Sequence, residues 1–325
     1  MDYQVVAVVS ADPNMRMALH DCLDRLGFPV FMLPDASQAN PILRASIKSN
    51  YSEASLAKMQ APSPWRLSDC SLAVVDLNGY GRESAELERA IEQVGELPTL
   101  YLDDPLPKEA QQQDHWRRSL VRKLVILEAE VTLGPANPDQ PIWLLIGSTG
   151  CPEAVRTFID SLPLHLPVGF LYGQHINSGF EKNLVTMLDG RRGFQASLAK
   201  SGQRLSAGNI VIAHPTQHMS LLDNDVLLVE PEPWPGQFQP SLESLVVDFS
   251  HRKLSAGGII VFSGMGGDGS AAMRLYASRG GRVWVQSPDT CVVSSMPEAV
   301  LASSKVELTA TPEALASHLA ALYPC

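Results

Sequence analysis

A serine, a histidine and an aspartate each follow a short apolar run in the C-terminal half of the sequence. Ser148 ends "LLIGS", His175 ends "FLYGQH" and Asp268 follows "IIVFSGMGG". A serine hydroxyl becomes a good nucleophile when an imidazole takes its proton, and a carboxylate holds that imidazole in the working tautomer. Because a triad is defined by geometry and not by chain order, these residues are candidates for a Ser-His-Asp set.

The residues after Ser148 favour a helix start that could bind an anion. Thr149, Gly150 and Cys151 lead into Pro152, and proline is favoured in the first turn of a helix. Free backbone N–H groups at such a start can stabilise an oxyanion. Each triad candidate taken alone has an ordinary structural interpretation, as a helix cap or a loop residue. The three strand ends together favour catalysis.

The loop around Asp268 also matches the dinucleotide-binding pattern G-x-G-x-x-G. Gly264, Gly266 and Gly269 have this spacing, and Asp289 lies where a ribose-binding acid could be expected. That fingerprint normally occupies the first strand-to-helix turn of its fold, however, and too little chain follows for two nucleotide-binding halves. We predict that Gly266 and Gly267 permit a tight turn that lets Asp268 reach His175, with a dinucleotide-binding oxidoreductase as a less favoured alternative.

Other candidate ligands for a metal or cofactor are few. His214 and His218 in "IAHPTQHM" are four residues apart, but Pro215 disfavours a helix that would carry both as ligands. The five cysteines are scattered and form no C-x-x-C pair, so neither a disulfide framework nor a zinc site is indicated. We predict no metal and no cofactor.

The second half of the chain alternates strands with helices. The runs "IWLLIGS", "VGFLYGQH" and "GIIVFSG" read as strands, while "PEAVRTFIDSL" and "SLESLVVDFSHRK" have apolar residues at helical spacing. This alternation predicts a doubly wound parallel sheet, whose ligands bind at the carboxyl ends of the strands. The close-set runs "FQASLAK", "NIVIAH" and "VLLVE" lack helical spacers, so we predict a small antiparallel insertion there.

The first half also alternates strands with helices, and it ends at a proline-rich linker. "YQVVAVVS", "FPVFMLP", "SLAVVDLN" and "LPTLYLDD" read as strands, and "NMRMALHDCLDRLG" as a helix. The polar stretch 36–69 is long for one crossover, which predicts an extra helix or an insertion. "LGPANPDQP" cannot propagate a helix or a sheet. We predict an α/β protein of two domains, 1–130 and 142–325, joined by a linker at 131–141, each a mostly parallel sheet flanked by helices.

Charge and the N-terminus limit the partners. The formal net charge of −10 argues against nucleic acid, which requires a clustered basic surface. The beginning "MDYQVVAVVSADPNMR" has no basic region before its apolar run, and that run is too short for a signal peptide or a membrane span. We expect a cytoplasmic protein without direct membrane insertion.

Six motifs together resemble a known family. "GSTGCPEA", "GQHINSGF", "IAHPTQHM", "QPSLESLV", "SGMGGDGSAAM" and "CVVSSMPEAV" have the order and spacing found in the catalytic domain of CheB-type chemotaxis protein-glutamate methylesterases. The resemblance runs from Ile142 to about Leu322. One departure lies at the serine, where family members commonly read A-S-T-G-G and this chain reads G-S-T-G-C from Gly147 to Cys151.

The resemblance implies a function and roles for residues. Ser148 matches the family nucleophile, His175 its general base and Asp268 its orienting acid, and Thr149 and Met265 match residues at the active site. The implied reaction is hydrolysis of glutamate γ-methyl esters on methylated chemoreceptor proteins, with release of methanol and without a cofactor. Glutamine deamidation, a chemotaxis histidine kinase or receptor array as further partner, and a catalytically silent receptor-binding adaptor remain open.

The first half resembles the phosphorylation-receiver domain of the same family, with its chemistry degenerated. Asp76 fits the phospho-acceptor, but Ser10 and Ala11 stand where two acids for Mg²⁺ are expected. Asp103 replaces the usual serine or threonine after the fourth strand, and the usual lysine has no match. We predict a flavodoxin-like receiver fold that aspartyl phosphorylation does not switch.

Overall fold

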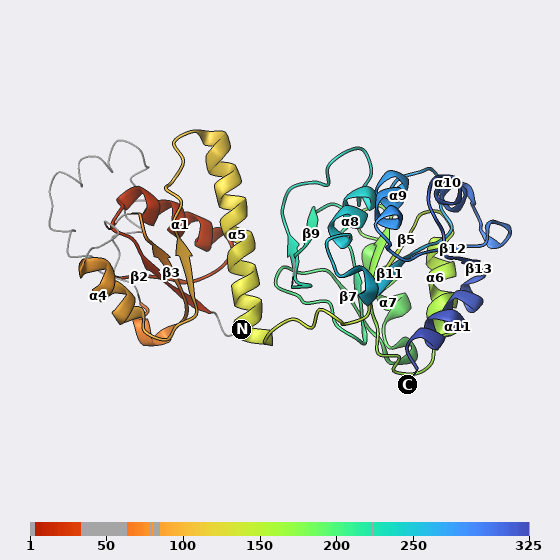
Figure 1. Ribbon diagram of the computed structural model, residues 1–325, viewed down its shortest axis with the longest axis horizontal. Coiled ribbons are helices and arrows are strands. Elements are labelled where there is room, and N and C mark those ends of the chain that lie inside the picture. The colour runs from red at the N-terminus through yellow and green to blue at the C-terminus, as the bar shows by residue number, and fades with distance from the viewer. Residues whose placement is uncertain (1–3, 34–63, 79, 81–84, 223, 325) are drawn as a thin grey trace. The chain divides into compact units, whose positions relative to one another are not determined.

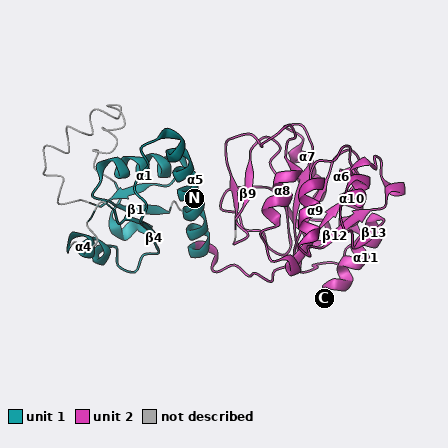
Figure 2. Cartoon of the chain, turned by 45° about the horizontal axis from the view of Figure 1, so that its top comes forward, with its two compact units in different colours: residues 1–131 teal, residues 132–325 magenta. Residues whose placement is uncertain are grey.

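The chain divides into two compact units, Met1–Val131 and Thr132–Cys325 (Figures 1 and 2). The structure is a computed structural model, and it describes residues 4–33, 64–78, 80, 85–222 and 224–324. Most of the extra helix or insertion predicted for 36–69 lies outside these residues. Within the described part of the chain, no helix has the length and apolar character needed to cross a membrane.

Unit 1 is built on a parallel sheet in the strand order β2-β1-β3-β4. The strands are β1 (Val5–Val9), β2 (Val30–Met32), β3 (Cys70–Asp76) and β4 (Thr99–Leu102), and the helices are α1 (Pro13–Arg25), α4 (Ala85–Val94), α5 (Ala110–Leu133) and the short turn η2 (Leu67–Asp69). Both β1 and the central part of β3 are buried, as expected for a sheet covered on both faces. The four predicted strands and the first helix are confirmed.

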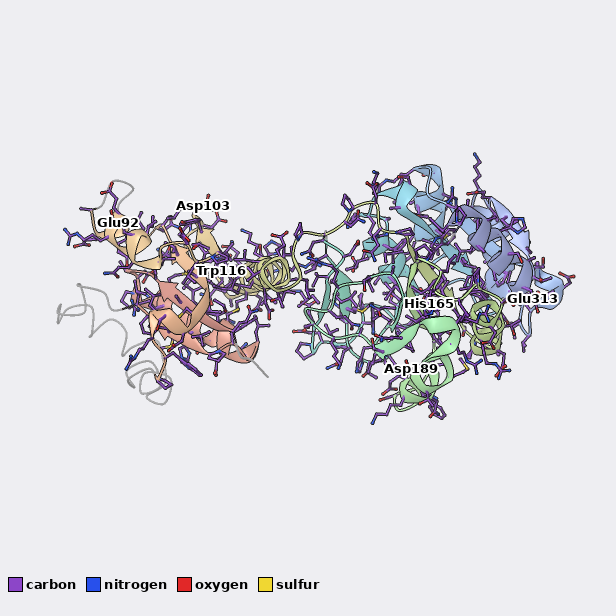
Figure 3. All side chains as sticks on the ribbon, turned by 90° about the horizontal axis from the view of Figure 1, so that it is seen from below. Glu92, Asp103, Trp116, His165, Asp189 and Glu313 are labelled. Atoms are coloured by element: carbon purple, nitrogen blue, oxygen red, sulfur yellow. The ribbon has the colours of Figure 1, made fainter. Side chains whose placement is uncertain are left out.

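Two helices cover one face of this sheet and α4 covers the other. Alternate residues of β1 and β3 pack with α1 and α5, including Trp116 of α5 (Figure 3). The intervening residues pack with α4. Helix α1 begins where Asp12 caps it, because its side chain accepts a hydrogen bond from the Asn14 N–H, and Pro13 supplies a preformed first turn.

Unit 2 is a seven-stranded parallel sheet in the order β13-β12-β11-β5-β6-β8-β7. The strands are β5 (Ile142–Gly147), β6 (Gly169–Gln174), β7 (Gln195–Leu198), β8 (Asn209–Ile212), β11 (Gly257–Val261), β12 (Val283–Gln286) and β13 (Leu308–Ala310). The helices are α6 (Cys151–Asp160), α7 (Glu181–Leu188), α8 (Leu242–Phe249), α9 (Ser270–Ser278), α10 (Ser295–Ser303) and α11 (Pro312–Leu322), with short turns η3 (Arg191–Gly193), η4 (Leu254–Ala256) and η5 (Pro288–Thr290).

Helices cover both faces of this sheet, which makes it doubly wound. Helices α8, α9 and α10 pack on one face, and α6, α7 and α11 pack on the other (Figure 1). The apolar stripes predicted for α6 and α8 are fully buried in these two cores. The predicted fold class is confirmed.

The predicted antiparallel insertion is smaller than expected. Strands β9 (Met219–Leu221) and β10 (Leu227–Val229) form a two-stranded antiparallel sheet. The runs "FQASLAK" and "NIVIAH", expected to belong to it, instead form β7 and β8, which pair in parallel at the edge of the main sheet. That part of the prediction was wrong, because the connection 199–208 returns the chain to the start of the next parallel strand without a helix.

The strand order brings three loops together at the carboxyl ends of the central strands. The first strand of unit 2, β5, lies between β6 and β11. The chain therefore winds to one side of β5 first and to the other side later, and the crevice where it reverses is the usual ligand site of such sheets. The loops that leave β5, β6 and β11 carry Ser148, His175 and Asp268 respectively.

The close pairing of β11 with β5 yields a test of the fold. A Cβ added at Gly257 would lie 1.8 Å from the Ile142 carbonyl oxygen, whereas one added at Gly267 would meet nothing nearer than 3.6 Å. We expect Gly257→Ala to lower the free energy of unfolding of unit 2 by about 1–3 kcal/mol, the usual cost of overpacking, or more. Urea unfolding measures this, and Gly267→Ala is the matched control. Equal stability of the two variants would contradict the register.

Candidate active site

His175 and Asp268 form a hydrogen-bonded pair at the carboxyl edge of the sheet. The His175 Nε2 atom lies 2.9 Å from Asp268 Oδ2, and the two side chains are 14% and 7% exposed. One residue follows β6 and the other lies in the loop between β11 and α9. Two strand ends that the sequence predicted to meet are thus joined by a direct contact between an imidazole and a carboxylate.

The N-terminus of α8 holds the Asp268 carboxylate in place. Leu242 N–H donates to Oδ2 at 2.8 Å, and Glu243 N–H donates to Oδ1 at 3.3 Å. The positive end of a helix dipole favours a negative charge at this position. Burial raises the pKa of the Glu243 carboxyl, and the nearby charge of Asp268 adds to that rise. The donors from α8 orient Asp268 toward the imidazole.

Ser148 lies between the end of β5 and the start of α6. Its N–H donates to the Ser263 carbonyl at 3.0 Å, and its carbonyl accepts from the Cys151 N–H at 3.1 Å. The His175 N–H donates to the Gly147 carbonyl at 3.3 Å, so His175 and Ser148 follow neighbouring strands. No hydrogen bond between described residues links Ser148 Oγ to His175. With Nε2 turned to Asp268, Nδ1 is the nitrogen available to the serine.

A buried glutamine that the sequence analysis missed ties these two segments together. Gln174 is 4% exposed, and its Nε2 donates to the carbonyls of Ser148 at 2.9 Å and His175 at 3.1 Å. Its Oε1 accepts from the Tyr172 hydroxyl at 2.9 Å. A signal was present, because a glutamine inside an apolar strand must find partners for a buried amide.

The loop after Ser148 presents backbone donors. Gly150 adopts a left-handed conformation with φ of 82° and precedes the first residue of α6. A Cβ there would lie 2.4 Å from the Val292 Cβ, so the close approach requires glycine. The Ser263 hydroxyl donates to the Thr149 carbonyl at 2.7 Å and fixes the loop. Among the described residues, none accepts a hydrogen bond from the Thr149 or Gly150 N–H.

The glycines of the loop after β11 allow close contact with the Ser148 loop and two left-handed backbone positions. A Cβ at Gly264 would lie 2.9 Å from the Ser148 nitrogen, so this glycine lets the two loops touch. Gly266 and Gly269 have φ values of 92° and 89°, which disfavour a side chain. Met265, between the first two, is 65% exposed. Gly266 agrees with the predicted tight turn, whereas Gly267 has no positive φ and Gly269 supplies the second such position.

Cys151 packs against Gly147 on the inner side of the serine loop. It is fully buried, its Sγ lies 3.5 Å from the Tyr172 hydroxyl, and burial raises the pKa of its thiol to about 12. A Cβ at Gly147 would lie 2.3 Å from the Cys151 Sγ. The two departures from A-S-T-G-G therefore compensate one another, since the sulfur fills the space that an alanine at 147 would take.

The remaining histidine candidates have structural partners. His218 Nδ1 lies 3.0 Å from Glu230 Oε2, and its ring packs edge-on against Trp234. The Trp234 Nε1 donates to the His214 carbonyl at 2.8 Å. Within the ranges that the structure describes, no group of three or more His, Cys, Asp or Glu side chains could hold a metal.

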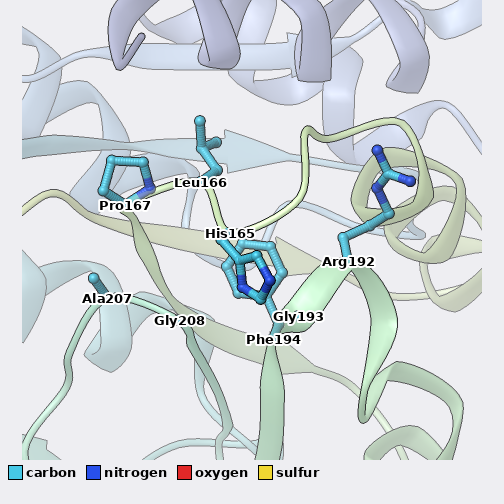
Figure 4. A pocket seen from close by; sticks show the side chains of 8 residues that line it. All are labelled: His165, Leu166, Pro167, Arg192, Gly193, Phe194, Ala207 and Gly208. Carbon is cyan, nitrogen blue, oxygen red and sulfur yellow. The ribbon is translucent and has the colours of Figure 1, made fainter. Parts of the chain in front are cut away.

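A cavity of about 290 Å³ lies at the amino ends of the strands, whereas Ser148 and His175 follow the carboxyl ends (Figure 4). It opens beside the loops that precede β6, β7 and β8, whereas His175 follows β6. Its lining is His165, Leu166, Pro167, Arg192, Gly193, Phe194, Ala207 and Gly208. None of the predicted site residues lines it.

The doubly wound parallel sheet brings Ser148 and the His175–Asp268 pair to its switch point, where proteins of this fold class bind their ligands. Residues 143–319 match the family described as CheB methylesterase. The chain belongs to this family.

Similar proteins share the C-terminal part of the chain. A protein-glutamate methylesterase/protein-glutamine glutaminase of Paramagnetospirillum magneticum is 33% identical over 176 residues, which cover 54% of this chain and 49% of that protein. One from Anaeromyxobacter dehalogenans is 29% identical over 209 residues, covering 63% and 61%. The chain spans about half the length of the first curated relatives it matches.

A solved structure supports the fold. The CheB methylesterase catalytic domain of Thermotoga maritima superposes with a TM-score of 0.53 at 23% identity, over 56% of this chain and 98% of that one. The two chains share the fold of the C-terminal unit.

The contact between Gly147 and Cys151 predicts coupled stability. We expect Gly147→Ala to lower the free energy of unfolding by about 1–3 kcal/mol, because its methyl group would overlap the cysteine sulfur. Adding Cys151→Gly should recover part of that loss, because the Ser263 carbonyl oxygen would still lie 2.9 Å from the added methyl group. Cys151→Gly alone supplies the fourth corner of a double-mutant cycle measured by urea unfolding. Additive losses would show that the two side chains do not compete for the same space.

Proposed function

We propose that this protein is a serine esterase that hydrolyses glutamate γ-methyl esters on methylated chemoreceptor proteins. The observation that carries the proposal is the 2.9 Å hydrogen bond between His175 and Asp268 at the sheet edge where Ser148 emerges. Family membership and the printed names of the relatives agree with it. In this proposal residues 142–325 form the esterase domain, and 131–141 link it to the receiver-like domain 1–130.

The geometry suggests how the reaction proceeds. Ser148 Oγ attacks the ester carbonyl while its proton passes to His175 Nδ1, and the Nε2–H stays donated to Asp268. The N–H groups of Thr149 and Gly150 stabilise the oxyanion of the tetrahedral intermediate. The imidazolium then protonates the departing methoxide, and methanol leaves an acyl-enzyme on Ser148.

Water completes the cycle through the same groups. His175 takes a proton from water as the hydroxide attacks the acyl carbonyl, and the proton returns to Ser148 Oγ as the glutamate carboxylate leaves. No cofactor enters either step. A glutamine side chain could form the same acyl-enzyme with ammonia as the leaving group, and the relatives' names include a protein-glutamine glutaminase. Deamidation is therefore a second candidate activity of the same site.

The triad assignment predicts non-additive losses. Ser148→Ala and His175→Ala should each remove nearly all methanol release from methylated receptor, and the double variant should be little worse, because the residues act as a unit. Asp268→Asn should lower kcat by about 10⁴-fold, since the imidazole loses its working tautomer. Circular dichroism controls for folding. Normal turnover in the serine or histidine variant would remove that residue from the mechanism, whereas no methanol release by the wild type would support the silent-adaptor alternative.

For unit 1 we propose a receiver-like fold that aspartyl phosphorylation does not switch. Asp76 is fully buried, and its Oδ2 accepts a hydrogen bond of 2.6 Å from the Ser10 hydroxyl. The Arg16 guanidinium holds the Ser10 carbonyl at 3.0 Å. Asp12 is used as the cap of α1, and Asp103 lies exposed after β4 (Figure 3).

These residues do not fit the metal site that receiver chemistry implies. Phosphoryl transfer to an aspartate needs a divalent cation held by carboxylate oxygens. Here a neutral hydroxyl donates to one oxygen of Asp76. Asp12, the acid nearest in sequence to Ser10 and Ala11, already caps a helix. Asp103 would add negative charge where a phosphoryl group would need a donor.

The resulting prediction concerns a small phosphodonor. Incubation of the full chain with acetyl phosphate and Mg²⁺ should give no acyl phosphate at Asp76 and no change in methanol release. Mass spectrometry and the esterase assay measure the two results, with Asp76→Asn as the matched control. A phosphorylated species that is absent from Asp76→Asn would contradict the proposal.

A further inference from the structure

We propose that Phe238 is a positioning residue that aims the His175 imidazole at Ser148. The Phe238 ring lies almost parallel to the imidazole, with an interplanar angle of 10° and 5.2 Å between the ring centroids. It comes from the segment between β10 and α8, far in sequence from β6. The kinetic part of this inference rests on the proposed esterase function, whereas the orientation of the ring does not.

The hydrogen bond to Asp268 leaves one motion of His175 weakly restrained. The torsion about the histidine Cβ–Cγ bond is broad, because it joins tetrahedral and planar atoms. The rotation axis passes between Cε1 and Nε2, so Nε2 moves less than Nδ1 as the ring turns. A single hydrogen bond at Nε2 therefore restrains the position of Nδ1 less tightly than that of Nε2.

A flat aromatic ring against the imidazole restrains that motion. Rotation of His175 about Cβ–Cγ would turn one ring edge toward Phe238, whose ring is parallel to the imidazole within 10° and whose centroid lies 5.2 Å from the imidazole centroid. The stack also covers one face of the histidine, whose side chain is only 14% exposed. A hydrogen bond in such a sheltered place is electrostatically stronger than one in water.

The segment that carries Phe238 is anchored on both sides. Before it, Trp234 is buried, and its indole N–H donates to the His214 carbonyl at 2.8 Å. After it, Ser241 caps α8 by accepting from the Ser244 N–H at 3.2 Å. Helix α8 then supplies the N–H groups that hold Asp268. The same short segment thus positions both the ring that covers His175 and the donors that orient its carboxylate.

Partial exposure distinguishes Phe238 from a core residue. Its side chain is 38% exposed, so the two hydrophobic cores do not require it. Phe180 offers a matched comparison, since it lies in the loop after His175, is 57% exposed and stacks on no ring among the described aromatic pairs. A role for Phe238 in packing alone would make the two leucine variants behave alike.

The kinetic experiment compares Phe238→Leu, Phe238→Tyr and Phe180→Leu in the full chain. We expect Phe238→Leu to lower kcat for methanol release by about 10- to 100-fold with KM within about twofold, because misaiming a reacting group by about 1 Å has effects of this size. Phe238→Tyr retains the stack and should keep kcat near that of the wild type, as should Phe180→Leu. Unchanged kcat in Phe238→Leu would overturn the proposal.

A second readout is independent of activity. Nitrogen-15 NMR of the His175 ring should show a single tautomer, protonated at Nε2, in the wild type, Phe238→Tyr and Phe180→Leu, and broadened or averaged signals in Phe238→Leu. Unchanged His175 signals in that variant would overturn the proposal whatever the rates. If the wild type released no methanol, the proposed function would fail and the NMR result alone would decide. Phe238→Met is the second non-aromatic variant should the leucine variant fold poorly.

Discussion

The hydrogen bond between His175 and Asp268 is the contact on which the rest of the site depends. It joins the end of β6 to the loop after β11, and the carboxylate in turn receives N–H groups from α8. Three elements distant in sequence must therefore be in register before the pair can form. The doubly wound sheet supplies that register, because β6 and β11 flank the same central strand.

Much of this arrangement could be predicted because it depends on local patterns. The apolar runs before Ser148, His175 and Asp268 identify three strand ends, and the carboxyl ends of parallel strands share one edge. The supporting contacts could not be predicted in the same way. Gln174 and Phe238 contact groups that only the tertiary fold brings near. A glutamine inside an apolar strand signals that it has partners but does not identify them.

The pairing of β7 and β8 shows where pattern reasoning fails in a specific way. Short strands without a helix between them usually form hairpins, and parallel strands usually need a longer crossover. In this chain the segment 199–208 runs back along the sheet edge, so the strands lie parallel. The direction of a strand depends on the path of the connection before it, and the composition of the strands carries no information about that path.

The sequence around Asp76 resembles that of a receiver phospho-acceptor. Its hydrogen bond with the Ser10 hydroxyl depends on the tertiary fold, so the sequence pattern does not predict it.

The fit between Gly147 and Cys151 restricts how such a sequence can have arisen. If an ancestor carried alanine at 147 and glycine at 151, as the common family pattern has it, two single-residue routes lead to the present pair. The route through alanine at 147 with cysteine at 151 places a methyl carbon 2.3 Å from sulfur. The route through glycine at both positions leaves only a small void. Of the two orders, the one in which a side chain is lost at 147 before one is gained at 151 avoids this overlap, so grafts of the serine loop should carry both residues together.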